Sequence, residues 1–180
     1  MTAYTRRPRE ETDVEAAGIG IDVGLSGAVA AVDSSGSCCK VYDIPTRLVG
    51  KKREYDLPAF DLLLKTLGQN LPAYVEKVGS RPGQGIVSTF RFGEGYGIAQ
   101  ALVVASGHRL TLVRPQTWKR IMLRDMGKDK GASCIRAAQL FPKAPLMGPR
   151  GGMKDGRAEA LLMAELARRE NLSKINPENN

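Results

Sequence analysis

The chain has 180 residues, 42% of them hydrophobic and 26% charged, which is the size and composition of one globular domain. No apolar run approaches the roughly 20 residues that a membrane-spanning helix requires, so no membrane partner is expected. The formal net charge of +8 at pH 7 favours an anionic partner, although many basic proteins bind no nucleic acid.

The two ends of the chain are polar. Residues 1–17 lack hydrophobic periodicity and are predicted to form a disordered arm, and residues 171–180 a flexible tail. The folded domain is therefore expected to span residues 18–170. The three cysteines show no metal-ligand spacing, and the single histidine, His108, is expected at a solvated turn. These counts exclude a histidine-rich zinc site.

The first half of the domain begins with strands. Hydrophobic patterning predicts short strands over residues 18–22, 28–32 and 38–44, joined as an antiparallel meander by turns rich in glycine and serine. Residues 47–54 are expected to form a basic loop. Apolar residues at helical spacing over 56–67 then predict the first helix.

The second half alternates strands and helices. Strands are predicted over residues 73–78 and 110–113, and helices over 88–106, from 115 onward, over 129–141 and over 155–169. The complete order is β-β-β-α-β-α-β-α-α-α. This order predicts one α/β domain, in which a mixed sheet carries helices on its faces.

Two acidic residues are predicted on apolar strands. Asp22 ends the first strand, where burying a carboxylate is costly unless it binds a cation or hydrogen-bond donors. Glu76 interrupts a short buried pattern. Each also has an ordinary structural interpretation: Asp22 as the cap of the following turn, and Glu76 as an outward-facing residue on a half-exposed strand.

Two further acids lie at the start of the last predicted helix. Asp155 and Glu159 are four positions apart, so they share one face of that helix. An acid in a first helical turn also stabilises the helix dipole, which is the structural alternative for Asp155. Glu159 is surrounded by residues that are expected to be buried.

Taken together, these four acids in a basic protein are suited to a pair of Mg²⁺ ions, since hard cations prefer carboxylate oxygens. Two such ions activate water and stabilise the leaving oxygen in phosphodiester hydrolysis. The sequence therefore predicts a metal-dependent nuclease.

Clustered basic residues favour the same class of substrate, because several cations neutralise several DNA phosphates. The clusters are Arg47, Lys51, Lys52 and Arg53; Arg114, Lys119, Arg120 and Arg124; and Lys128 and Lys130. Lys119 and Lys130 are expected to approach the acids, where a cation stabilises developing phosphorane charge. Each cluster alone is equally consistent with a solvated surface.

The loop after Glu76 is expected to overhang the acids. Within it, Gln84 is a candidate for contacts with base edges and Arg81 for contacts with bases or phosphates. A purely structural turn, made by Pro82 and the neighbouring glycines, explains the same composition.

Four collinear motifs resemble the RuvC-type Holliday junction resolvases, in particular the monokaryotic-chloroplast branch and its bacterial and phage relatives. The motifs are GIDVGLSG (20–27), VEKVGSRPGQG (75–85), RPQTWK (114–119) and KDGRAEALL (154–162). The resemblance covers about residues 18–169. It implies a ribonuclease H-like fold with a mixed five-stranded sheet, a homodimer, and two Mg²⁺ or Mn²⁺ ions per active site.

The implied activity is resolution of a four-way DNA junction by paired symmetric nicks, with a preference for cytosine-rich sequence at the crossover. The resemblance places Asp22, Glu76, Asp155 and Glu159 on the catalytic, metal-binding acids and Lys119 in a basic stretch near the scissile strand. It also implies a chloroplast nucleoid, with the transit peptide absent from this chain, or a bacterial or phage cytoplasm.

The chain departs from the family at two places. Glu159 stands where many relatives have aspartate, and Ile86, Val87 and Phe90 occupy a region where land-plant members have tryptophans.

Three alternative functions remain open. The segment DVGLSG (22–27) also resembles the phosphate-binding hairpin of actin-like and sugar-kinase ATPases, and ATP hydrolysis without DNA would favour that class. A ribonuclease H-like nuclease acting on another substrate, such as an RNA–DNA hybrid, would share the acids. A non-catalytic junction-binding protein would not require them.

Overall fold

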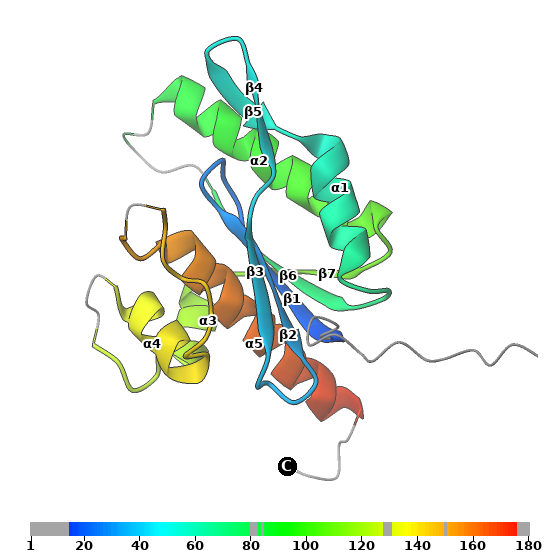
Figure 1. Ribbon diagram of the computed structural model, residues 1–180, viewed down its shortest axis with the longest axis vertical. Helices are drawn as coiled ribbons and strands as arrows, with labels where there is room; N and C mark the ends of the chain where they lie inside the picture. The colour runs from blue at the N-terminus through cyan, green and yellow to red at the C-terminus, as the bar shows by residue number, and fades with distance from the viewer. Residues whose placement is uncertain (1–14, 80–82, 84, 128–130, 150, 176–180) are drawn as a thin grey trace, which may run out of the picture.

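Five strands form one mixed sheet in the order β3-β2-β1-β6-β7 (Figure 1). A computed structural model describes residues 15–79, 83, 85–127, 131–149 and 151–175. The strands are β1 (Ala16–Asp22), β2 (Ala28–Asp33), β3 (Cys39–Asp43), β6 (Pro72–Glu76) and β7 (Arg109–Val113). The first three pair antiparallel, whereas β6 and β7 run parallel to β1.

Five helices cover the two faces of this sheet. They are α1 (Leu57–Thr66), α2 (Ile86–Ala105), α3 (Pro115–Met122), α4 (Ala132–Leu140) and α5 (Asp155–Ile175). Figure 1 shows α1 and α2 on one face and α3, α4 and α5 on the other. This arrangement confirms the predicted mixed five-stranded sheet flanked by helices.

The central strands are buried on both faces, so their sequences are almost continuously apolar. In β2, Val29 and Ala31 pack into the core beneath α1 and α2, while Ala28, Ala30 and Val32 pack into the core beneath α5. This alternation follows from the period of two along a strand.

Helix α5 crosses β1 at unusually close range. A side chain at Gly20 would collide with the backbone of Ala160 and Ala164, and one at Gly18 with the backbone of Ala164 and Arg168. The two glycines therefore let the helix axis lie close to the strand, since no Cβ separates the two backbones. This contact fixes the first turns of α5 beside the end of β1.

Residues 47–54 are not the loop that the sequence predicted. They belong to a separate antiparallel hairpin of β4 (Thr46–Val49) and β5 (Lys52–Tyr55), which projects beside α2 (Figure 1). Its turn contains Gly50 at φ +61°, the left-handed conformation that two-residue hairpin turns use. The prediction failed because the hairpin strands are short and highly charged, so they lack the apolar alternation that identifies a strand.

The ends of the folded domain also differ from the prediction. Strand β1 already begins at Ala16, and α5 continues to Ile175, so residues 171–175 are helical rather than part of a tail. Polar contacts hold this last part of the helix: Tyr74 donates to Glu170, and Arg109 Nη2 donates to Asn171 Oδ1 at 2.8 Å.

His108 is buried, with 5% of its surface exposed, and is not at a solvated turn. Its Nδ1 accepts from the Leu71 amide at 3.4 Å, and its Nε2 lies 2.9 Å from the Leu64 carbonyl oxygen. The ring thus links the end of α1 to the start of β6, a burial that local sequence does not reveal.

Within the described parts of the chain, no helix has both the length and the apolar character needed to cross a membrane.

Candidate active site

Two acidic side chains lie side by side at one edge of the sheet. Asp22 is the last residue of β1, and Glu76 is the last residue of β6. The strands are parallel, with Ile21 opposite Val75, so the next residue on each strand reaches the same edge. The register therefore brings these two carboxylates together.

Glu159 joins them from α5. One carboxylate oxygen from each of Asp22, Glu76 and Glu159 lies within 4.8 Å of the others, and all three side chains are half-buried. Three acids far apart in sequence thus converge at one point, between the carboxyl ends of two strands and the second turn of a helix.

Gly156 makes the approach of α5 to Asp22 possible. A Cβ atom at this position would lie 2.6 Å from Asp22 Oδ2 and 3.2 Å from the Ser26 carbonyl oxygen. Both distances are shorter than a relaxed van der Waals contact. Any larger residue would force either the Asp22 carboxylate or the start of the helix to move.

Burial and crowding change the titration of the central acid. Burial, followed by the negative charges of Glu159 and Glu76, raises the pKa of Asp22 to about 8, against the opposing charge of Lys119. The protein without a bound cation therefore holds a proton on Asp22 at neutral pH. A divalent cation would supply the positive charge that displaces this proton.

The flanking donors come from α3 and α4. Lys119 Nζ lies 2.8 Å from Glu159 Oε1, and Ser133 Oγ lies 3.4 Å from the same oxygen. The Trp118 indole donates from Nε1 to Glu76 Oε1 at 2.9 Å. Helix α3 thus supplies donors to both Glu76 and Glu159, and α4 supplies a donor to Glu159.

Asp155 stands apart from the three converging acids. It is the first residue of α5, is exposed, and lies with Oδ1 3.3 Å from the Cys134 thiol, which donates to it. Its negative charge still contributes to the raised pKa of Asp22. The expected four-acid cluster is therefore observed as three converging carboxylates with a fourth at the rim.

A cavity of about 640 Å³ opens beside the acids, between α3 and α4. Its lining includes the acids Asp155 and Glu159 and the basic residues Lys119, Arg120 and Arg124. A cavity lined by both kinds of charge is suited to a ligand that combines a cation with phosphate groups.

The basic residues of the first predicted cluster lie on the β4–β5 hairpin: Arg47, Lys52 and Arg53 on its strands and Lys51 at its turn. Arg53 Nη2 donates to Ser26 Oγ at 2.9 Å, which connects the hairpin to the turn that follows Asp22. Four other predicted DNA-contacting residues, Arg81, Gln84, Lys128 and Lys130, lie outside the described residues.

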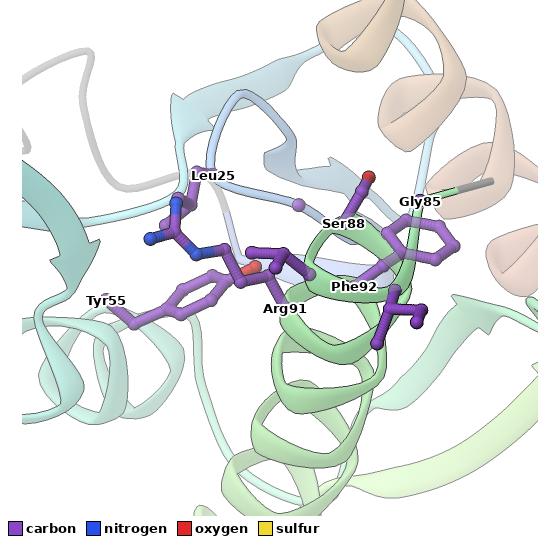
Figure 2. Close-up of a pocket in the computed structure, with 9 residues that line it drawn as sticks. Leu25, Tyr55, Gly85, Ser88, Arg91 and Phe92 are labelled. Carbon is purple, nitrogen blue, oxygen red and sulfur yellow. The ribbon is translucent and has the colours of Figure 1, made fainter.

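A second, more apolar cavity of about 680 Å³ lies on the other side of the β1–β2 turn. Figure 2 shows Leu25, Tyr55, Arg91 and Phe92 around it, at the first turns of α2. The exposed Ile86 also contributes to its lining. An apolar surface with one guanidinium therefore adjoins the acidic edge.

The donor set fits a hard divalent cation. All three converging ligand atoms are carboxylate oxygens, the type that Mg²⁺, Mn²⁺ and Ca²⁺ prefer, and no soft sulfur ligand is among them. Burial, and then the negative charges of Glu159 and Glu76, raise the pKa of Asp22, as expected for a carboxylate in a cation site without its cation.

Sequence reasoning missed three contributors to this site. Gly156 lies inside the KDGRAEALL motif, but its role depends on a close approach that only packing creates. Trp118 follows the helical apolar pattern of a core residue, which conceals its contact with Glu76. Ser133 has no local signal, since its position opposite Glu159 depends on how α4 packs against α5.

Comparison with known proteins adds a likeness in fold. No protein-family model and no curated protein matches the chain by sequence. A structure of T. thermophilus RuvC in complex with a Holliday junction substrate aligns with a TM-score of 0.55 and 12% identity, over 87% of this chain and 94% of that one. A second Thermus thermophilus RuvC structure aligns with a TM-score of 0.49 and 14% identity, over 87% and 95% of the two chains. The chain therefore has the ribonuclease H-like fold of RuvC.

Proposed function

We propose that this protein is a metal-dependent endonuclease that resolves four-way DNA junctions by paired symmetric nicks. The observation that carries the proposal is the convergence of Asp22, Glu76 and Glu159 within 4.8 Å in a fold shared with RuvC. The basic character of the chain and the four collinear motifs support the same substrate.

The three converging acids, with Asp155 at the rim, would hold two Mg²⁺ or Mn²⁺ ions. Such ions activate water and stabilise the leaving oxygen in phosphodiester hydrolysis. Asp22 would give up its proton on binding a cation, because its raised pKa results from burial and from neighbouring negative charge. Glu159 comes from helix α5 and brings a carboxylate oxygen within 4.8 Å of those of Asp22 and Glu76.

Lys119 is the proposed electrostatic partner of the reacting phosphate. Its ammonium lies 2.8 Å from Glu159, and its side chain is 42% exposed towards the cavity between α3 and α4. From there it is placed to contact a phosphate oxygen and to stabilise the negative charge that develops during attack. Arg120 lines the same cavity and would contact the neighbouring phosphate.

The remaining basic residues would position the DNA arms. The exposed Arg47, Lys51, Lys52 and Arg53 form a projecting hairpin that is joined to the turn after Asp22. Such contacts orient DNA without reading its sequence. Arg81, Gln84, Lys128 and Lys130 complete the proposed interface, and a preference for cytosine-rich crossovers is part of the proposal through the family resemblance.

The proposed enzyme is a homodimer, since two symmetric nicks require two active centres. The outer side of α2 supports this assembly. Ile86, Phe90 and Val104 are 88%, 75% and 60% exposed, and their helical spacing places them on one side of α2. An exposed apolar stripe of this kind is typical of an interface. Sedimentation analysis of the wild type and of Phe90→Glu tests this interface. The proposal requires that the wild type sediments as a dimer and that the substitution weakens dimerisation.

For the compartment, we propose a chloroplast nucleoid, with bacterial or phage cytoplasm as the alternative. The family resemblance supports both. Imaging of the full-length gene product in its source cell distinguishes them.

Cleavage of a labelled mobile four-way junction with Mg²⁺ tests the activity, beside linear duplex and RNA–DNA hybrid controls. The proposal requires nicks at symmetry-related positions in the junction, and loss of these nicks in Asp22→Asn and Glu76→Gln proteins. Equal cutting of linear duplex would contradict it, as would unchanged junction cleavage by either variant. Preferential cutting of the hybrid would assign the site to another nuclease class.

A further inference from the structure

Trp118 is the only tryptophan in the chain, and it is fully buried. It lies on α3, which begins two residues after β7 ends at Val113. Val113 pairs with Glu76 in the sheet, and its carbonyl oxygen accepts from the Lys77 amide at 2.7 Å. The backbone thus holds the start of α3 directly beside the end of β6.

The indole nitrogen of Trp118 contacts a proposed metal ligand. It lies 2.9 Å from Glu76 Oε1 and donates its hydrogen there. An indole N–H is neutral and can only donate, so it orients the carboxylate without cancelling its negative charge. An arginine or lysine in this place would compete with a cation for that charge.

The ring of the same side chain lies beside Lys119. The Lys119 ammonium is 5.0 Å from the centre of the Trp118 ring, within the range of a cation–π contact. The ammonium also lies 2.8 Å from Glu159 Oε1. Trp118 therefore contacts Glu76 through its nitrogen and Lys119 through its ring, and Lys119 in turn contacts Glu159.

We propose that Trp118 is a positioning residue of the carboxylate centre, which orients Glu76 towards a divalent cation and holds the Lys119 ammonium beside Glu159. The inference rests on the proposed metal-dependent function, and it adds a residue that contacts neither metal nor substrate. Donors that orient metal ligands typically change metal affinity by about 10- to 100-fold when removed.

The test compares Trp118→Phe with Phe141→Leu. Trp118→Phe keeps an aromatic ring and removes the N–H, while Phe141 packs in the same core and has no polar group. Thermal unfolding of each protein is followed by circular dichroism across a Mg²⁺ or Mn²⁺ titration. We expect both variants to unfold at lower temperature without metal, and only Trp118→Phe to raise the half-saturating metal concentration, by about ten-fold.

Cleavage supplies a second readout. We expect Trp118→Phe to recover most of its junction-cleavage rate when Mg²⁺ is raised, because the defect lies in metal affinity. A half-saturating metal concentration equal to that of the wild type would overturn the positioning role. A wild type whose unfolding temperature does not respond to either metal would overturn the proposed metal centre itself, and the positioning role with it.

Fluorescence gives a test that requires no change at Trp118. Since Trp118 is the sole tryptophan, its emission reports on the Glu76 carboxylate. We expect Mg²⁺ to shift the wild-type emission over the same concentrations that raise the unfolding temperature, and the shift to disappear in Glu76→Gln. Metal binding without any change in emission would contradict the contact between Trp118 and the metal site.

Discussion

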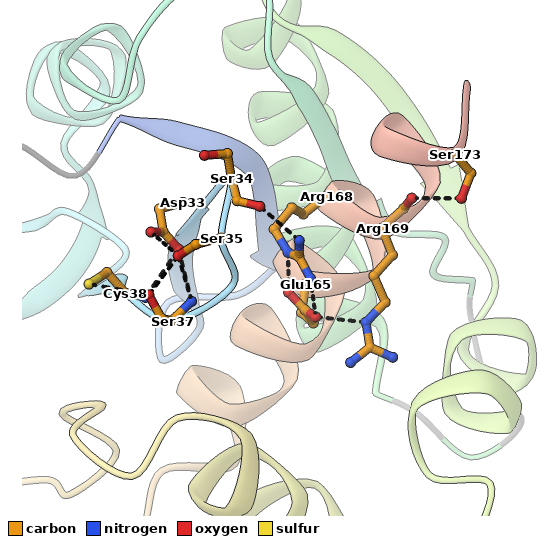
Figure 3. A network of polar contacts seen from close by, with 9 residues as sticks. All are labelled: Asp33, Ser34, Ser35, Ser37, Cys38, Glu165, Arg168, Arg169 and Ser173. Atoms are coloured by element: carbon orange, nitrogen blue, oxygen red, sulfur yellow. Dashed lines mark hydrogen bonds and ion pairs between the residues drawn. The ribbon is translucent and has the colours of Figure 1, made fainter. Parts of the chain in front are cut away.

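Helix α5 carries buried or half-buried acids in two regions that differ in how their charge is balanced. In the later region, Glu165 is 3% exposed and is fully paired (Figure 3). Arg168 contacts both of its oxygens at 2.7 and 2.8 Å, and Arg169 Nε lies 2.6 Å from Oε1. Arg168 also donates to the Ser34 carbonyl at 2.9 Å, which fastens the helix to the β2–β3 turn.

At the beginning of the helix, acids face other acids. Glu159 converges with Asp22 and Glu76, and burial, followed by repulsion from these two acids, raises the pKa of Asp22 to about 8. At Glu165 two arginines pair with one acid, whereas at Glu159 one lysine stands beside three converging acids. The Glu165 region of α5 thus contributes to stability, whereas the Glu159 region is suited to binding a cation.

The largest expected effect is on cleavage by Asp22→Asn. The amide keeps the shape of the side chain but removes its charge from the centre of the acids, so we expect junction cleavage to fall by about 1000-fold. Single-turnover cleavage with saturating Mg²⁺ measures this. The protein should still bind the junction in a gel-shift assay, and a rate within a few-fold of wild type would place the reaction elsewhere.

Glu165→Ala should lower the stability of the protein and leave its metal binding unchanged. It leaves Arg168, whose side chain is 13% exposed, without its carboxylate, so we expect the free energy of unfolding to fall by about 3 kcal/mol. Urea denaturation monitored by circular dichroism provides the measurement. The half-saturating Mg²⁺ concentration should not change. If Glu165→Ala weakened metal binding as strongly as Glu159→Gln, the two regions of α5 would not be independent.

Gly156→Ala tests how closely α5 must approach Asp22. The added methyl group would lie 2.6 Å from Asp22 Oδ2, so the helix start or the carboxylate must move. Because small displacements of catalytic groups have large effects on rate, we expect cleavage to fall by about 10- to 100-fold. Gly152→Ala is the control, since a Cβ there meets no atom within 4 Å. Equal activity of the two variants would contradict the close-approach argument.

Stability without metal should depend on pH through Asp22. Its pKa is about 8 in the folded protein and near 4 in the unfolded chain, so the unfolded chain loses its proton first. The wild type is therefore expected to lose stability as pH rises from about 4 to about 8, relative to Asp22→Asn. At pH 8 in EDTA, we expect the Asp22→Asn protein to be more stable than the wild type by up to ~5 kcal/mol. Equal stability of the two proteins throughout this range would contradict the raised pKa of Asp22.

The smallest expected effect concerns Asp43. Hydrogen bonds from Arg157, and then from Lys154, lower the pKa of Asp43 to about 2. The stabilisation is present above pH 4 and is lost as pH falls towards 2. The Asp43 side chain is 43% exposed, so solvent screening should limit the loss in Asp43→Asn to less than about 1 kcal/mol at pH 7. Thermal unfolding at pH 7 and at pH 2.5 should show a smaller difference between Asp43→Asn and the wild type at pH 2.5 than at pH 7.

Local patterns were enough to predict most of the elements and the acids that converge. Apolar runs and helical spacing predicted the strands of the main sheet and all five helices, because a buried face imposes a period on the sequence. The β4–β5 hairpin was missed since it projects from the domain and buries little. The burial of His108 was missed because its partners, Leu64 and Leu71, are distant in the chain.

By itself, the sequence determined which residues are chemically suited to the site: Asp22 and Glu76 at strand ends, and Asp155 and Glu159 four positions apart. Only the tertiary structure decided how these acids meet. The parallel register of β1 and β6 and the glycine contacts of α5 bring three carboxylates together and leave Asp155 at the rim. The spacing of apolar residues along the chain indicates which residues are buried. The distance between two buried residues depends instead on how whole helices and strands pack.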